Sequence, residues 1–335
     1  MPMLMTTQPA TDLKPLGRRG AAIARSVVLP SRPVRRAYAL VSCVVALLSL
    51  PGAATAGGAW VPEPGHGDVS LGFSDKSADR SYDVQGNAYF NRSGGQRSYH
   101  DFRYLYLSGE AGLFKRLSLT YLFTYLDGYE GVRSAEEKNA GLSDAWLGLK
   151  YALRTGDLPM AIAFTYRTPY FYDLQGPYNR HLFDANGKVK GVSPEWRGLL
   201  KEDYTLSYLI SRSMLGRGWW NVQAGYSWRE GAPADAIPIS ADAGFPLPFL
   251  GSWVKVAGVY VGSRHNDSRA QPDDRFGSSA TNNFNDAEML KGGVSWLLPL
   301  AHRERWFVEV GYNQWLWGRS ARIYKEPFFS IDRRY

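Results

Sequence analysis

The chain has 335 residues, with 39 Lys and Arg against 31 Asp and Glu, a formal net charge of +8. Residues 1–56 hold seven of the basic residues and one acid, and subtracting these leaves 32 basic and 30 acidic residues for 57–335. The nearly neutral body disfavours a nucleic-acid partner. The one cysteine, Cys43, lies in the same N-terminal stretch, so residues 57–335 contain no disulfide and no Cys-ligated metal site.

The first 56 residues read as a secretory leader. Arg35 and Arg36 precede an apolar run over 37–50, then the helix breaker Pro51-Gly52 and the small-x-small sequence Ala54-Thr55-Ala56. The apolar run is shorter than the roughly 20 residues that a transmembrane helix needs. We expect an extended leader with a signal peptide over 1–56, cleaved after Ala56, and export to the outer membrane of a Gram-negative bacterium.

The body alternates apolar and polar residues with a period of two, which is typical of strands with one apolar face. The clearest examples lie at 68–73, 117–125, 144–151, 160–167, 200–211, 221–229 and 306–313, with less regular strands near 99–112, 237–245, 252–263, 287–298 and 323–335. We therefore predict an all-β fold, a transmembrane antiparallel up-and-down β-barrel of about 12 strands over residues 57–335. An even number of strands puts both termini on the periplasmic side.

The connections between these strands differ systematically in length. Every second one is short, namely Leu113–Arg116, Arg154–Pro159, Ser213–Gly218, Pro246–Gly251 and Pro299–Glu304. The others include long polar stretches at 85–98, 127–141, 173–196 and 264–286. Short periplasmic turns and longer outer loops are the pattern of outer-membrane barrels. Within 173–196, Asn186-Gly187 is a signal for a two-residue hairpin, so this loop is expected to carry a ribbon or to fold inward.

Hydrocarbon supplies no hydrogen-bond partner, so only helices and closed barrels span it. No apolar run after residue 56 reaches 18 residues, which leaves the barrel. Aromatic residues near the strand ends fit a lipid–water boundary: Tyr166, Tyr170, Trp219, Trp220, Trp228, Trp296, Trp306, Trp315 and Trp317. The C-terminal Tyr335 fits the aromatic last residue of a barrel.

Three short motifs carry a resemblance to known proteins. They are Gly58-Ala59-Trp60, the strand opening Gly141-Leu142-Ser143-Asp144-Ala145-Trp146, and Gly225-Tyr226-Ser227-Trp228-Arg229 ahead of Asp235. With these, the chain resembles XagA-like outer-membrane barrels and barrels of the meta-pathway phenol-degradation type. The resemblance implies an outer-membrane barrel compatible with a channel for small organic molecules, and it brings no catalytic residues. The chain departs from it at Tyr335, where Phe is usual.

If the apolar faces meet lipid, the opposite faces line the lumen. The charged residues on these faces are Lys150, Arg167, Asp203, Arg229, Asp242, Lys255, Lys291 and Glu309. One reading is a narrow, slightly cation-lined pore that favours anions or polar organic solutes, with Arg167, Arg229 and Lys291 at a constriction. The other is a network of ion pairs that fills the lumen, since buried charges need partners whether or not anything passes.

Two further function classes stay open. A structural or accessory barrel, for example for polysaccharide export, would have a plugged lumen. A lipid hydrolase would rest on His265 with Ser263 and Ser268, but no acid is placed by spacing, so we expect no enzyme. The acids of 264–286 lack the spacing of a calcium loop. We expect no cofactor and no metal. The expected partners are outer-membrane lipid and lipopolysaccharide, the barrel-assembly machinery and a small-molecule solute.

Overall fold

A computed structural model of the protein describes residues 58–335 except 84, 94–95, 133–134, 170–181, 184–188, 192–201, 215–217, 230–234, 249–250, 265–287 and 301–304. Twelve strands form the wall of a barrel: β1 (Gly67–Ala78), β6 (Tyr99–Phe114), β7 (Leu117–Val132), β9 (Ala145–Arg154), β10 (Met160–Thr168), β13 (Asp203–Met214), β14 (Gly218–Arg229), β15 (Asp235–Pro246), β16 (Trp253–Arg264), β17 (Glu288–Pro299), β18 (Trp306–Arg319) and β20 (Lys325–Arg334).

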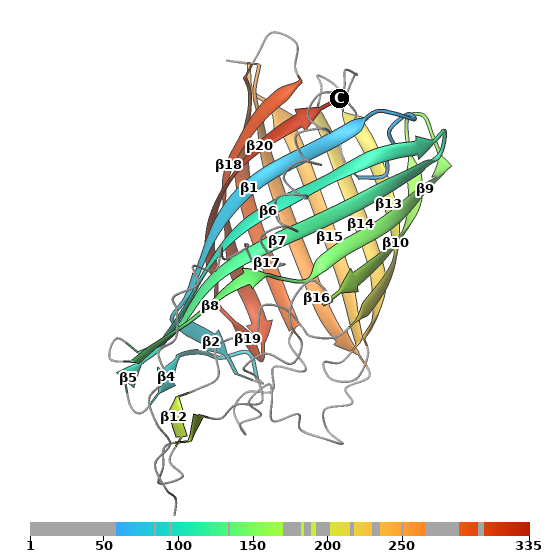
Figure 1. Ribbon diagram of the computed structural model, residues 1–335. Coiled ribbons are helices and arrows are strands. Elements are labelled where there is room, and N and C mark those ends of the chain that lie inside the picture. Colours follow the sequence, from blue (N-terminus) through green and yellow to red (C-terminus); the bar gives the residue numbers. More distant parts are fainter. Residues whose placement is uncertain are drawn as a thin grey trace, which may run out of the picture. The chain divides into compact units, whose positions relative to one another are not determined.

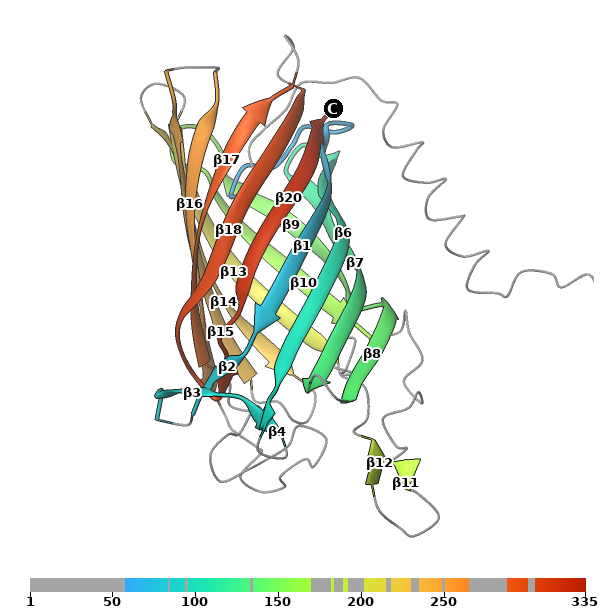
Figure 2. The same cartoon turned by 90° about the vertical axis from the view of Figure 1, so that its left-hand side faces the viewer.

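Each wall strand pairs antiparallel with its two neighbours, and the ring closes where the first strand, β1, pairs with the last, β20. β1 pairs with β20 at one side and with β6 at the other, and β6 pairs with β7. From there the order runs through β9, β10 and β13 to β18 and back to β20 (Figures 1 and 2). The predicted fold class, a closed 12-stranded antiparallel barrel, is confirmed. Closure pairs the backbone groups of every wall strand on both sides.

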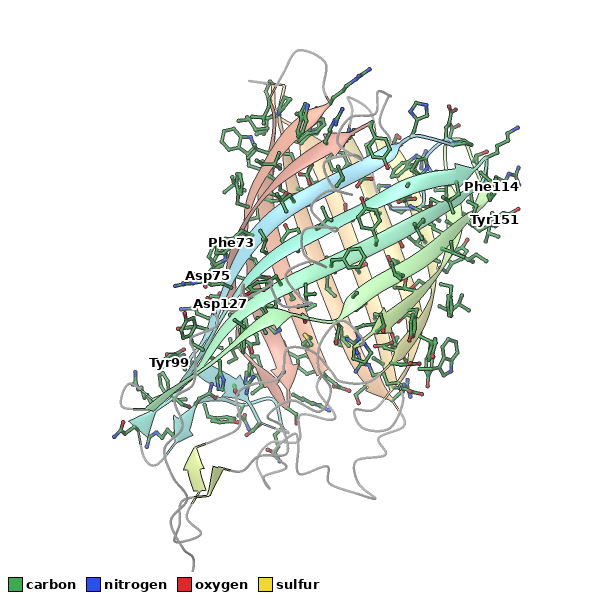
Figure 3. The ribbon with its side chains drawn as sticks, viewed as in Figure 1. Phe73, Asp75, Tyr99, Phe114, Asp127 and Tyr151 are labelled. Atoms are coloured by element: carbon green, nitrogen blue, oxygen red, sulfur yellow. The ribbon has the colours of Figure 1, made fainter. Side chains whose placement is uncertain are left out.

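The outer face of the wall is apolar. Large side chains that stay exposed include Leu71, Leu149, Phe164, Leu206 and Val294, and each alternates along its strand with a buried or half-buried neighbour. Many of the buried residues are polar, so the usual distribution of a soluble protein is inverted. In Figure 3, Phe73 lies on the outer wall, and Asp75 and Asp127 lie farther toward the end that carries β2.

Beyond that apolar belt, the start of β6 and the end of β7 continue as a paired ribbon. β7 continues to Val132 and pairs with β8 (Ala135–Leu142), so the prediction of a loop over 127–141 was wrong. β8 and β9 pair with the same edge of β7, one after the other. β7 pairs with β9 from Leu117 to Leu122 and with β8 from Tyr125 onward (Figure 2). The alternation of 117–125 continues past Asp127, and polar outward residues are tolerated there because the ribbon has passed the apolar belt.

Shorter strands lie in the longer connections. β2 (Arg80–Tyr82) pairs with β3 (Ala88–Phe90) and with β19 (Ala321–Arg322), and β4 (Arg92–Ser93) pairs with β5 (Gln96–Arg97). In the stretch 173–196 the predicted ribbon is present as β11 (Leu182–Phe183) paired with β12 (Val189–Gly191), although Asn186-Gly187 lies outside the described residues. Most of 173–196 and nearly all of 264–286 also lie outside them.

The start of β1 and the C-terminal residue meet at the end of the barrel with the short turns. Gly67 and Tyr335 exchange two backbone hydrogen bonds, of 3.0 and 2.9 Å. The short turns were predicted correctly, since β6 and β7, β9 and β10, and β13 and β14 are joined where the sequence placed them. Among the described residues, no helix is long and apolar enough to cross a membrane.

Candidate functional site

The lumen is the candidate site, because the charged residues predicted from the alternation lie on the face of their strands opposite the apolar belt. Asp203, Lys150, Arg167 and Glu309 are almost completely buried, with exposed fractions of 2, 3, 8 and 8%. The register places charged residues directly beside polar partners on neighbouring strands, as in Asp203 with Arg229 and Asp242 with Asn221. The eight residues then fall into separate clusters.

The first cluster joins β9, β10, β13 and β14 at the end with the longer connections. The guanidinium of Arg167 lies 3.0 Å from Asp203 and 3.7 Å from Asp144, and Nε of Arg229 donates to Asp203 at 3.2 Å. Arg167 also lies over the ring of Trp146, 5.1 Å from its centroid. Two arginines alternate with two aspartates, so each charge has an opposite neighbour.

The second cluster joins β1, β17, β18 and β20. The Glu326 carboxylate forms ion pairs with Lys76 Nζ at 3.3 Å and with Lys291 Nζ at 2.7 Å. Asn313 Nδ2 donates a hydrogen bond to the same carboxylate at 3.2 Å. Both ammonium groups lie near the ring of Trp315. Lys291 therefore belongs to a different cluster from Arg167 and Arg229, and the constriction that the three were expected to form stays a prediction.

A third cluster, nearer the short turns, consists of Lys255, Glu309 and Ser295. Lys255 Nζ lies 2.5 Å from the Glu309 carboxylate, which also accepts from Ser295 Oγ at 2.5 Å.

The ion-pair partners change the charge balance expected of the lumen. The eight predicted residues carry five positive and three negative charges. Their partners add one positive charge, Lys76, and three negative charges, Glu110, Asp144 and Glu326. This set of described residues is neutral, so the expected excess of cationic groups does not hold for it. Glu110 and Glu326 were missed because their strands, near 99–112 and 323–335, alternate less regularly, whereas Lys76 lies beyond the predicted segment 68–73 and Asp144 at the start of 144–151.

A fourth cluster ties the wall to the residues ahead of β1. Lys150 Nζ donates to Glu110 at 2.6 Å and to the backbone carbonyls of Gly58 and Trp60 at 2.7 and 2.8 Å. Glu110 also accepts from Ser118 Oγ at 2.5 Å. We call residues 58–66 the N-terminal strap, because they run from the start of β1 to strands on another part of the wall (Figures 1 and 2).

The strap is fastened along its length. Near β1, Gly65 N–H donates to the carbonyl of Gly112, and Gly112 N–H donates to that of His66. A Cβ on Gly112 would lie 2.1 Å from the carbonyl oxygen of Glu63, so only glycine fits beneath the strap there. At the far end, Ala59 N–H donates to Ser211 Oγ on β13 at 2.7 Å. Ala59 packs with Ala161 and Leu209.

Beside the strap lies a cavity of about 220 Å³. Its lining is mainly polar and comprises Gly58, Thr120, Lys150, Ala163, Thr165, Leu209, Asn221, Val222, Gln223, Ser240 and Asp242. The Asp242 carboxylate accepts from Asn221 Nδ2 at 2.9 Å and from Trp219 Nε1 at 3.1 Å. The cavity offers hydroxyl, amide and carboxylate groups to a small polar molecule.

Two aromatic assignments were wrong. Trp219 and Trp315 were predicted at the lipid boundary, but Trp219 donates to the lumen residue Asp242, and Trp315 is buried beside Lys291. Trp219 and Trp220 are adjacent in one strand, so only one of them can face lipid.

The described residues do not include the full set of side chains that the hydrolase hypothesis named. Ser263 lies in β16, whereas His265 and Ser268 lie outside the described residues. In the part of the chain that the structure describes, no three His, Cys, Asp or Glu side chains are grouped as a metal site requires.

Comparison with known proteins identifies the fold. The chain is similar to the COG4313 outer membrane channel from Pseudomonas putida F1, with a TM-score of 0.54 and 12% identity over 84% of this chain and 100% of that one. The translocator domain of the autotransporter NalP from Neisseria meningitidis has a TM-score of 0.43 and 9% identity over 90% of this chain and 96% of that one. The CymD monoaromatic hydrocarbon channel has a TM-score of 0.40 and 9% identity over 81% of this chain and 89% of that one. No protein-family model and no curated protein matches the sequence. The fold is that of outer-membrane β-barrel channels, and at these identities the likeness extends to fold alone.

Proposed function

We propose that the protein is an outer-membrane channel through which small polar or organic solutes diffuse. The observation that carries this proposal is the closed ring of strands with an apolar belt outside and a hydrophilic lumen inside. Such an exterior is stable in hydrocarbon, since no backbone group of a closed ring is left without a partner there. A wall of 12 strands lies between the 8 strands that side chains fill and the 16–18 strands of wide porins.

The charge pattern supports a channel of weak ionic selectivity. With Asp242 included, the lumen charges described above balance, and within the described part of the chain all of them except Asp242 lie in ion pairs. An ion pair presents a dipole to a passing solute, and a polar uncharged molecule can interact with this dipole without breaking the pair and leaving an unpaired ion. The mild anion preference predicted from the sequence is therefore not part of the proposal.

Planar-bilayer recording of the purified protein tests the proposal. We expect discrete conductance steps with nearly equal permeability to K⁺ and Cl⁻. Arg229→Glu puts a second carboxylate beside Asp203 and is expected to shift the reversal potential in a salt gradient toward cation preference. Lys325→Glu is the matched control, because it makes the same charge change at an exposed position of β20 on the face opposite Glu326. Bilayers that stay silent at all voltages would refute a channel.

Silent bilayers would instead favour a structural or accessory barrel, for example in polysaccharide export. One observation favours this second candidate: the N-terminal strap and its hydrogen bonds to Lys150 and Ser211 occupy part of the lumen. A channel with the strap in place conducts through the remaining space, so conductance separates the two candidates directly.

The finer assignments belong to the same proposal. They are membership of the XagA-like or meta-pathway barrels, export with a cleaved leader, insertion by the barrel-assembly machinery, and contact with lipid and lipopolysaccharide. No enzymatic activity is proposed. Phospholipid and lipopolysaccharide deacylation by the wild type and by His265→Ala tests this, and activity that depends on His265 would reverse it.

A further inference from the structure

A hydrogen-bond acceptor without a donor lies at the far end of the strap. Asn221 Nδ2 donates to Asp242, and because a carboxylate at neutral pH only accepts, this bond fixes the orientation of the amide. Asn221 Oδ1 therefore points the other way. Among the described residues it has no hydrogen-bond partner, although Asn221 is only 9% exposed. Buried polar atoms in proteins are rarely left in this state.

The neighbouring carboxylate, Asp242, also differs from the acids of the four clusters. Glu110, Asp203, Glu309 and Glu326 each contact a lysine or an arginine. Asp242 receives only neutral donors, and within the described ranges it forms no ion pair. An acceptor and a carboxylate side by side suit one donor group that carries a positive charge. A primary ammonium has three N–H donors and meets both needs.

The chain itself approaches this pair. A Cβ on Gly58 would lie 2.1 Å from Asn221 Oδ1 and 2.5 Å from Ser211 Oγ, so the backbone of Gly58 lies directly against the amide. Its φ of +85° is in the left-handed region that favours glycine. Lys150 and Ser211 both hold the peptide group that joins Gly58 to Ala59. The Cα of residue 57 follows about 3.8 Å from that of Gly58.

We propose that Asn221 and Asp242 form a binding site for a primary ammonium group, and that its occupant is the α-ammonium created at Gly57 by cleavage after Ala56. In the precursor, residue 57 carries a neutral amide, so the site is filled only after processing. The strap is then fixed across the lumen by an ion pair at one end and by β1 at the other. The proposal rests on the cleavage position and not on conduction.

The surrounding charges set the sign of the expected pH dependence. The ammonium faces Asp242 on β15, and Lys150 on β9 carries its own counter-ion, Glu110 on β6. An opposite charge raises the pKa of an amine above the ordinary α-amino value of about 7.7–8.0. Docking is therefore complete below that ordinary value and is lost as the pH rises through the raised pKa.

The test uses full-length precursor expressed in a Gram-negative host, with the mature protein purified from the outer membrane and its first residue identified by mass spectrometry. An amine-reactive acylating reagent is then applied across pH values, and labelling of the N-terminal peptide is measured in folded and denatured protein. We expect Gly57 as first residue and about fivefold slower labelling at pH 8 in the folded state, as a pKa rise of one unit from the ordinary α-amino value gives.

Asp242→Asn should restore labelling to nearly the denatured rate, whereas the control Glu309→Gln, which removes a carboxylate bound to Lys255, should not. Asn221→Leu provides a second variant with the same expectation if Asp242→Asn fails to insert. A different first residue, or labelling of folded wild type at the denatured rate, would overturn the proposal. If methylammonium blocks the wild-type conductance, if the block needs Asp242, and if Gly57 is labelled freely, the site binds a solute and not the N-terminus. Silent bilayers would refute the channel but not this proposal, which does not depend on conduction.

Discussion

Replacing Lys150 by Met tests the balance of forces in the lumen most directly. The change preserves most of the side-chain volume but removes three hydrogen bonds, to Glu110 and to the carbonyls of Gly58 and Trp60. Glu110, which is only 7% exposed, then loses its counter-ion and keeps the hydrogen bond that it accepts from Ser118. Removing one member of a buried ion pair costs about 3–5 kcal/mol. Water in the lumen reduces this cost, so we expect a loss of about 3 kcal/mol.

Urea unfolding of the refolded barrel in lipid vesicles, followed by tryptophan fluorescence, measures this loss. The double variant Lys150→Met with Glu110→Gln is the matched control, because it removes both charges and leaves no buried ion. We expect it to recover more than half of the lost stability. A single variant within about 0.5 kcal/mol of wild type, or a double variant no more stable than the single, would refute the assignment of Lys150 and Glu110 as a buried pair.

Three further outcomes follow from the wall, a lumen cluster and the strap. Leu149→Arg on the apolar belt should lower the unfolding free energy by about 2–4 kcal/mol, whereas Leu153→Arg, beside a short turn, should cost only about 0–1 kcal/mol in the same vesicle assay. Glu326→Gln removes the carboxylate between two lysines, so the reversal potential should move toward anion preference; an unchanged potential would mean that ions do not pass this cluster. Gly112→Ala places a methyl group where the strap crosses β6 and should raise both single-channel conductance and protease cleavage within the strap, and an unaltered strap would contradict the packing described.

Local pattern was enough to predict the wall. A period of two assigns each residue to one face, and in a barrel the two faces have opposite polarity, so Leu149 and Lys150 could be placed on opposite sides of β9 from sequence alone. The spacing of the alternating segments located the short turns, and in the structure Gly156 and Gly251, with φ of +97° and +57°, lie in two of them. The strand ends on the other side were less predictable, since β7 and β8 extend beyond the apolar belt, where polarity no longer distinguishes strand from loop.

Which charges meet inside the barrel was decided only by the tertiary structure. Lys150 pairs with Glu110 across 40 residues, Lys291 with Glu326 across 35, and the strap reaches Ser211 across 152. The alternation predicts that a charged side chain points into the lumen. Which opposite charge it meets there depends on strand register and tilt, which are properties of the whole ring. The sequence did not predict the contacts of the strap, because its hydrogen bonds are made by backbone groups, which every residue carries and which only folding brings to particular side chains.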